Sequence, residues 1–346
     1  MPEGASENPV LVEVTRSGIV ESRHRGAVAI TDASGRMLLA IGDVETPIFP
    51  RSAVKAMQAL PLIESGAADA FGLGNDEIAV ACASHSGEAI HVAAVRSLLA
   101  KAGLDESLLA CGAHWPLSED AARELIRGGQ RPLPVHNNCS GKHAGMLATS
   151  VHLGFEVRGY EQPEHPLQIM IERVISESCG VALEQSPMGV DGCSVPTWAL
   201  PLKALAQGFA RFGSGEAFTT ERKAAAERLR RACYDVPALV AGEGRLDTII
   251  LRGVGPSVFV KGGAEGVHCA AFPDLGLGLA LKVDDGTKRG AEHVLCALIG
   301  AITPAASSLL AERLGGAIRN WKGLQVGQIR ASEKLMAAAA ETQRAS

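Results

Sequence analysis

Aromatic residues are scarce in this chain, at 4% of 346 residues, and no excess of positive charge accompanies them. The formal net charge is −5. Proteins that bind nucleic acids usually carry a basic patch, and many stack aromatic rings on the bases. The composition therefore argues against nucleic acid and against an anionic membrane surface as partners, and it favours a small-molecule ligand.

Long hydrophobic runs are also missing. The most apolar stretch, residues 295–311, is interrupted by Gly300, Thr303 and Pro304. It therefore predicts packed helices rather than a membrane span. Residues 1–8 are acidic and polar, and they lack the basic start and apolar core of a secretory signal. We expect a cytoplasmic protein with no membrane partner.

The eight cysteines lack the paired C-x-x-C spacing that marks the common zinc sites. In a chain without an export signal, thiols are expected to be reduced rather than bridged. Most of these cysteines are therefore interpreted as buried apolar side chains.

The chain has enough apolar residues for a large core, at 47%, and no low-complexity linker divides it. Strand patterns occur at both ends, in residues 10–14, 27–30, 37–41, 258–260, 266–271 and 278–283. Helical periodicity dominates between them and returns near the C-terminus, in residues 90–102, 119–127, 201–212, 221–233 and 287–302. We predict one α/β (α+β) domain over residues 1–346. Its antiparallel sheet lobe comprises about 9–50 and 251–330, and a mainly helical inserted lobe comprises about 51–250.

A serine and a lysine lie one turn apart at the start of a predicted helix. Pro50 precedes this helix, at a position where a helix start tolerates proline. Ser52 and Lys55 then share one face, and a neutral lysine can accept the proton of a serine hydroxyl. The S-x-x-K spacing is common by chance, so an exposed lysine on a helix is the alternative interpretation.

A second lysine follows a predicted strand. Lys261 stands before Gly262 and Gly263, an order similar to the K-T-G element that accompanies S-x-x-K in β-lactamases and penicillin-binding proteins. Gly262 takes the place of the threonine. The combination strengthens the interpretation of Ser52 as a nucleophile.

A small polar segment, Cys82–Glu88, follows the strand-like run Ile78–Ala81. Its residues suit a loop that faces a ligand. In the alternative interpretation, Ser84 or Ser86 only caps the next helix.

Polar donors are densest in residues 136–145, which we interpret as a functional loop. Asp191, in a second segment, could pair with a substrate ammonium group, while Arg51 could receive a carboxylate. Zinc is a further alternative, because Cys139 and Cys193 could hold it together with His136, His143 or Lys142. Two ordinary thiols remain the competing interpretation.

Six segments in this order resemble the asparaginase II family typified by the Rhizobium etli L-asparaginases. They are residues 14–26, Arg51–Lys55, Ala81–Glu88, Asn138–His143, Asp191–Ser194 and Lys261–Gly263.

The resemblance implies a serine β-lactamase-like fold, a homodimer, and hydrolysis of L-asparagine to L-aspartate and ammonia. It implies two catalytic pairs, Ser52 with Lys55 and Ser84 with Lys261. It also implies a zinc ion, held by three further residues, that need not perform the hydrolysis. These metal ligands are Cys139, Lys142 and Cys193, and the expected substrate-binding residues are Arg51, Asp191 and His143.

Two other functions stay open at this point. One is a zinc-dependent amidohydrolase that uses metal-bound water. The other is a non-catalytic protein that senses an amino acid or a metal on the same scaffold. The preference between asparagine and glutamine, and the identity of the attacking serine, are also open.

Overall fold

The computed structural model describes residues 7–345, apart from the side chains of 312 and 343–345. Residues 1–6, on which the prediction of a cytoplasmic protein partly rests, lie outside this range. Among residues 7–345, no helix has both the length and the apolar character needed to cross a bilayer.

One antiparallel sheet of eight strands joins the two ends of the chain. Its order is β11-β12-β1-β2-β10-β9-β8, with β3 paired to β2. The strands are β1 (Val10–Arg16), β2 (Ile19–Asp32), β3 (Met37–Ile41), β8 (Phe259–Gly262), β9 (Val267–Phe272), β10 (Leu277–Val283), β11 (Ala317–Arg319) and β12 (Gln325–Ala331). The pairing of β2 with β10 brings the N-terminal strands beside the C-terminal ones. This confirms the predicted sheet from both chain ends.

Two short ribbons lie outside the main sheet. They are β4 (Pro47–Ile48) with β7 (Leu200–Pro201), and β5 (Met188–Val190) with β6 (Pro196–Trp198). Asp191 and Cys193 lie in the turn that connects β5 to β6, so the second ribbon holds this turn in place.

Most helices belong to the segment between the two sets of strands. The α-helices are α1 (Lys55–Gln58), α2 (Leu60–Glu64), α3 (Ala67–Ala70), α4 (Asn75–Ala81), α5 (Ala89–Lys101), α6 (Glu119–Arg127), α7 (Ser140–Leu153), α8 (Pro166–Cys179), α9 (Leu202–Ser214), α10 (Thr220–Asp235), α11 (Ala238–Ala241), α12 (Leu246–Val254), α13 (Lys288–Ile302), α14 (Pro304–Gly315) and α15 (Glu333–Ala345). The 3-10 helices are η1 (Arg51–Val54), η2 (Glu106–Leu108), η3 (Pro134–His136), η4 (Leu183–Gln185) and η5 (Pro273–Leu275).

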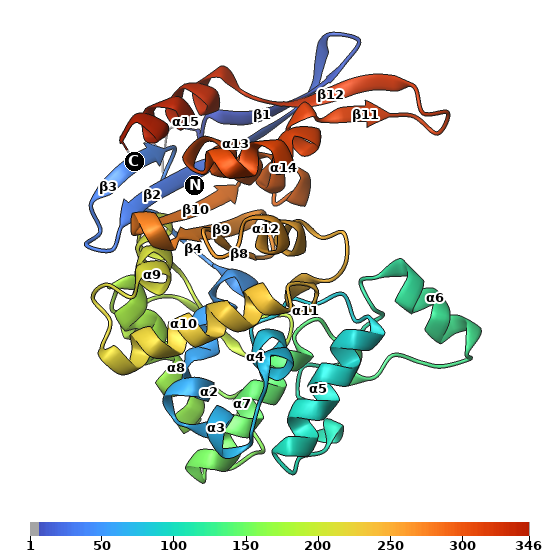
Figure 1. Ribbon diagram of the computed structural model, residues 1–346, viewed down its shortest axis with the longest axis vertical. Helices are drawn as coiled ribbons and strands as arrows, with labels where there is room; N and C mark the ends of the chain where they lie inside the picture. The colour runs from blue at the N-terminus through green and yellow to red at the C-terminus, as the bar shows by residue number, and fades with distance from the viewer. Residues whose placement is uncertain (1–6, 346) are drawn as a thin grey trace.

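Helices cover both faces of the sheet. Helix α9 packs on β2, β9 and β10, while α13 and α15 pack on β1 and its neighbours from the opposite side. Figure 1 shows the helical lobe below this sheet, with α6 projecting from it. Gly278 explains the closeness of α9, because a Cβ atom there would lie 2.0 Å from the Ala206 carbonyl oxygen.

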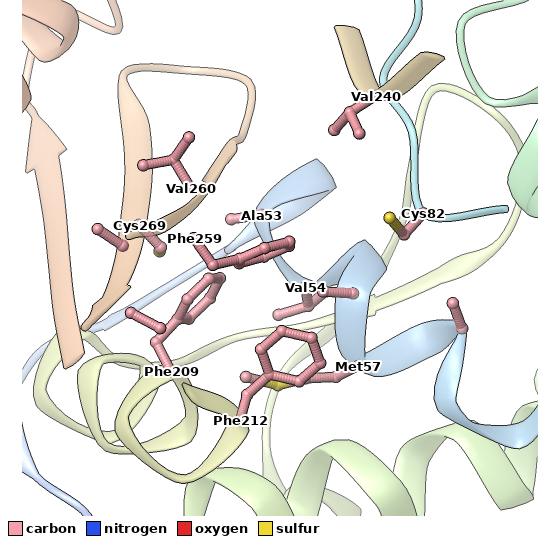
Figure 2. Close-up of a cluster of buried hydrophobic side chains, with 14 of the residues drawn as sticks. Ala53, Val54, Met57, Cys82, Phe209, Phe212, Val240, Phe259, Val260 and Cys269 are labelled. Atoms are coloured by element: carbon pink, nitrogen blue, oxygen red, sulfur yellow. The ribbon is translucent and has the colours of Figure 1, made fainter. Parts of the chain in front are cut away.

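A buried apolar cluster supports the segment that carries Ser52 and Lys55. Ala53, Val54 and Met57 are each no more than 3% exposed, and they lie among Phe209, Phe212, Phe259 and their neighbours in Figure 2. The cluster therefore ties η1 and α1 to α9 and to strand β8. Packing of this kind holds the backbone of η1 and α1 rigidly.

Two local predictions are wrong. Residues 78–81 were expected to be a strand, and they are the last turn of α4. Residues 140–145 were expected to be a loop, and they form the buried first turns of α7. Small residues explain the second difference, because a Cβ atom at Gly141 would lie 2.1 Å from the Val80 carbonyl oxygen. Helix α7 can therefore pack directly on α4.

Candidate active site

A cavity of about 280 Å³ lies between the helical lobe and the end of strand β8. Ser52 and Ser84 both line it, and Asn138 lies on the same wall. The opposite side is formed by the first turn of α12, including Asp247, and by the turn between β8 and β9. Both predicted catalytic serines therefore reach one cavity.

One of the two predicted serine–lysine pairs is joined by a hydrogen bond. Nζ of Lys261 donates to Oγ of Ser84 at 2.9 Å and to the carbonyl oxygen of Gly262 at 2.9 Å. The capping alternative does not describe Ser84, because the N-cap of α5 is Glu88. Ser84 is therefore turned toward Lys261 rather than toward a helix end.

The environment of Lys261 favours proton transfer near neutral pH. Its side chain is fully buried, and burial lowers its pKa to about 8. Asp247 opposes this shift, whereas the positive charge of Lys55 adds to it. A lysine tuned in this way can donate or accept a proton under physiological conditions.

The other predicted pair is close in sequence but is not joined through its side chains. Lys55 is completely buried. Its Nζ atom donates to the carbonyl oxygens of Ala83 at 2.8 Å and Asn138 at 3.4 Å. Among the hydrogen bonds of residues 7–345, none involves Oγ of Ser52, so this hydroxyl is free to turn into the cavity.

Arg51, directly before Ser52, adopts a left-handed backbone conformation with φ of 51°. Its Nε atom lies 2.6 Å from Oδ1 of Asp191. Arginine rarely adopts this conformation, and strain of this kind gathers at functional sites. The two residues expected to bind opposite ends of a substrate thus pair with each other, and Arg51 stands directly before Ser52.

The predicted metal ligands meet at one place. Nζ of Lys142 lies 3.0 Å from Sγ of Cys193. A hydrogen bond to Cys139 lowers the pKa of the Cys193 thiol to about 5, with Lys142 also contributing. The same hydrogen bond, together with burial, raises the pKa of Cys139 to about 12. The cluster therefore holds one thiolate and one neutral thiol beside an ammonium group.

This donor set fits zinc only when Lys142 takes part. Two sulfur atoms and one nitrogen atom are donors that zinc accepts, provided that the amine has lost its proton. Within the described part of the chain, no three His, Cys, Asp or Glu side chains gather so as to hold a metal ion. His136 does not join the two cysteines in such a group, and its Nδ1 atom accepts from the Leu133 amide at 2.9 Å.

His143 is fully buried in α7, and its Nδ1 atom lies 2.6 Å from Oη of Tyr160. Burial lowers its pKa to about 3, so the ring is neutral. Its Nε2 atom has no partner among the described residues. The side chain is not among those that line the 280 Å³ cavity.

Sequence reasoning missed a buried pair in the wall of the cavity. Nε2 of His268 lies 2.7 Å from Oδ1 of Asp247. The sequence held one indication for His268: if the predicted strands around Val260 and His268 form a hairpin, His268 lies opposite Gly262, next to Lys261. No pattern in the sequence pointed to Asp247.

Solved structures overlap with this chain only in part. A β-lactamase from Mycobacterium bovis has a TM-score of 0.39 at 12% identity, over 83% of this chain and 94% of its own. Mglu in its native form has a TM-score of 0.36 at 14% identity, over 87% of this chain and 64% of Mglu. A simvastatin synthase mutant from Aspergillus terreus has a TM-score of 0.33 at 11% identity, over 75% of this chain and 86% of its own. Likenesses at these scores say nothing about activity.

No curated protein matches the sequence significantly. A family model described as L-asparaginase II, however, matches residues 12–331. That range contains both serine–lysine pairs, the Arg51–Asp191 pair and the thiol–lysine cluster. The chain therefore belongs to the L-asparaginase II family, a family of asparaginase-type hydrolases.

Proposed function

We propose that this protein hydrolyses L-asparagine to L-aspartate and ammonia through serine–lysine catalysis. The observation that carries the proposal is the 2.9 Å hydrogen bond between Lys261 and Ser84, in a cavity that Ser52 also lines. A serine hydroxyl is a weak nucleophile until a base accepts its proton. Two serines and two buried lysines supply an attacking group and two proton carriers.

In the proposed acylation step, Lys55 first gives up the proton that makes it a cation, and it then accepts the hydroxyl proton of Ser52 as Oγ of Ser52 attacks the side-chain amide carbon. The two N–H groups of the neutral amine can keep both carbonyl partners, because the nitrogen lone pair takes the proton. The carbon–nitrogen bond then breaks, and Lys261 passes a proton through Ser84 to the departing nitrogen. Ammonia leaves, and an ester between aspartate and Ser52 remains.

Deacylation reverses the roles of the two lysines. A water molecule gives one proton through Ser84 to the now neutral Lys261, and its oxygen atom attacks the ester. Lys55 returns its proton to Oγ of Ser52 as the ester bond breaks. Both lysines regain their starting protonation states, and aspartate is released.

Arg51 and Asp191 are the proposed anchors for the substrate. An amino acid carries a carboxylate and an ammonium group, which complement a guanidinium and a carboxylate respectively. Their ion pair of 2.6 Å keeps both groups ordered before the substrate arrives. His143 belongs to the proposed binding set through helix α7, which it shares with Lys142, since its own side chain is fully buried and does not line the cavity.

Zinc, if bound, would be held by Cys139, Lys142 and Cys193, where it would add positive charge beside the substrate anchors. Lys142 would then have to give up its proton. The residues at that site bind and orient rather than exchange protons with the amide. A homodimer in the cytoplasm completes the proposal.

The decisive experiment measures ammonia released from asparagine and from glutamine by purified protein, with and without zinc. Ser52→Ala and Ser84→Ala are compared with Ser97→Ala, whose hydroxyl donates to Glu77 away from the cavity. The protein is also incubated with an amide analogue that is hydrolysed slowly, and mass spectrometry of its peptides then identifies the serine that carries the acyl group.

We expect the acyl group on Ser52, little activity in either site variant, and normal activity in Ser97→Ala. Full activity in Ser52→Ala together with complete loss on chelation would instead establish a zinc-dependent amidohydrolase. Asparagine binding without ammonia release would establish a sensor.

A further inference from the structure

The carboxylate of Asp247 joins two strands at the wall of the cavity. Its Oδ1 atom lies 2.7 Å from Nε2 of His268 on β9. Its Oδ2 atom accepts a hydrogen bond of 2.9 Å from the main-chain amide of Gly262 on β8. Asp247 itself belongs to the first turn of α12. One side chain therefore fixes a helix, a strand end and an imidazole ring relative to each other.

The connection continues from Gly262 to the reacting hydroxyl. The carbonyl oxygen of Gly262 accepts from Nζ of Lys261 at 2.9 Å, and the same Nζ atom donates to Oγ of Ser84 at 2.9 Å. Hydrogen bonds thus run from His268 through Asp247 and Gly262 to Lys261 and Ser84. The orientation of Gly262 decides where the lysine ammonium points.

Because residue 262 is a glycine, Asp247 and His268 can lie close to the backbone of strand β8. A Cβ atom there would lie 3.3 Å from Cε1 of His268 and 3.4 Å from Oδ2 of Asp247. The carboxylate can therefore approach the strand directly, without an intervening water molecule.

The carboxylate remains an anion although it is deeply buried. Asp247 is 7% exposed and His268 is 5% exposed. Burial alone would raise the pKa of Asp247, but His268, Lys261 and the Gly262 amide hold it well below its usual range. A buried charge is costly unless it is paired in this way, and here its partners lead directly to the proposed proton carrier.

We infer that Asp247 is a positioning residue of the reaction, which holds Gly262 so that Lys261 faces Ser84. His268 keeps the carboxylate in place from the other side. The inference rests on the proposed function for its kinetic consequence, while the position of Lys261 can be followed without any substrate.

The chain offers a second histidine–aspartate pair as a control, one whose carboxylate is partly exposed. Nδ1 of His24 lies 2.6 Å from Oδ2 of Asp285, and the two side chains are 2% and 40% exposed. Their other hydrogen bonds lead to Thr287 and Arg289, and none leads to Lys261. Removing the Asp285 carboxylate therefore measures what the loss of a histidine–aspartate contact does when that contact is not connected to Lys261.

The experiment compares Asp247→Asn with Asp285→Asn in the full chain. Two quantities are measured: kcat and KM for asparagine across pH, and the titration of Lys261 by NMR of protein with 13C-labelled lysine, assigned with Lys261→Arg. The asparagine side chain that replaces Asp247 in the first variant has the shape of the aspartate side chain but carries no charge. Lys261 then loses an anion that raises its pKa, so its titration midpoint should fall below about 8.

We expect Asp247→Asn to lower kcat by roughly tenfold to a hundredfold, less than the roughly 10²- to 10⁴-fold cost of losing an acid–base group outright, with KM within about twofold of the original. Asp285→Asn should leave both measurements unchanged. His268→Gln, which retains the carboxylate, should give a smaller loss of kcat and serves if Asp247→Asn does not fold.

An unchanged titration of Lys261 and an unchanged kcat in Asp247→Asn, or in His268→Gln if the first variant does not fold, would overturn the inference. A loss equal to that of Asp285→Asn would do the same. Wild-type protein that releases no ammonia would refute the proposed function instead, and the Lys261 titration would still decide the role of Asp247.

Discussion

The Nζ atom of Lys261 lies 2.9 Å from Oγ of Ser84, although 177 positions separate the two residues in the sequence. Strand β8 carries the lysine, and the segment after α4 carries the serine. The contact therefore crosses the boundary between the sheet and the helical lobe. It also makes the proposed activity sensitive to the protonation of one buried lysine.

Activity should decline as the pH rises through about 8. Lys261 has a lowered pKa of about 8 because of its burial, and the proposed acylation step needs its protonated form. Below that pH the lysine carries the proton that ammonia requires, and above it the proton is lost. The measurement is kcat/KM for asparagine from pH 6 to about 10. A rate that keeps rising above pH 8 would show that Lys261 acts first as a base.

Lys261→Met should lower kcat by about 10² to 10⁴, the usual contribution of general acid–base catalysis. Lys282→Met is the control, because Lys282 lies on β10 and its Nζ atom donates to the carbonyl oxygen of Glu265 at 2.7 Å. Steady-state ammonia release measures both variants. Equal activities would remove Lys261 from the proposed mechanism.

Zinc binding should depend on three residues. Cys193→Ser, Cys139→Ser and Lys142→Met should each weaken zinc binding at least about tenfold, since losing even an outer-shell partner of a metal costs that much. Cys179→Ser removes a fully buried thiol elsewhere and should change nothing. Zinc per chain is measured by elemental analysis after dialysis against a metal buffer. Equal zinc content in all four variants would place the metal elsewhere.

Asp191→Asn should destabilise the fold by about 1–3 kcal/mol, the range for a charged hydrogen bond in a largely buried setting. The side chains of Arg51 and Asp191 are only 28% and 9% exposed, so water screens their attraction weakly. The variant should also raise KM for asparagine. Urea unfolding measures the first effect and ammonia release the second.

A surface ion pair provides the comparison for this variant. The side chains of Arg123 and Glu119 are 56% and 82% exposed. Glu119→Gln should therefore change the free energy of unfolding by no more than about 0.5 kcal/mol. Similar losses in both variants would mean that the Arg51–Asp191 pair behaves as an ordinary surface contact.

Gly278→Ala should destabilise the protein by about 1–3 kcal/mol or more, because overpacking forces the backbone to move. Its added Cβ atom would lie 2.0 Å from the Ala206 carbonyl oxygen and 2.3 Å from the Ala210 amide nitrogen. Gly315→Ala is the control, since nothing lies within 4 Å of its added atom. Thermal unfolding should show a lower Tm for the first variant only.

Local patterns in the sequence determined the elements of the sheet. The turn residues at 32–35 separate β2 from β3, and alternating or β-branched segments mark β1, β9 and β10. Strands β11 and β12 were not foreseen. Ser52 and Lys55 were also found from local spacing, because residues three apart share a face of a helix.

Only the tertiary structure decided how distant side chains pair. Asp191 lies 140 positions from Arg51, and Asp247 precedes His268 by 21. Spacing along the chain fixes geometry within a helix or strand, but it does not fix which surfaces pack together. Burial then changes the chemistry, because the lowered pKa of Lys261 depends on neighbours contributed by other elements. The sequence by itself thus determined most strands of the sheet and most of the candidate groups, and the packing of the two lobes decided which of those groups meet.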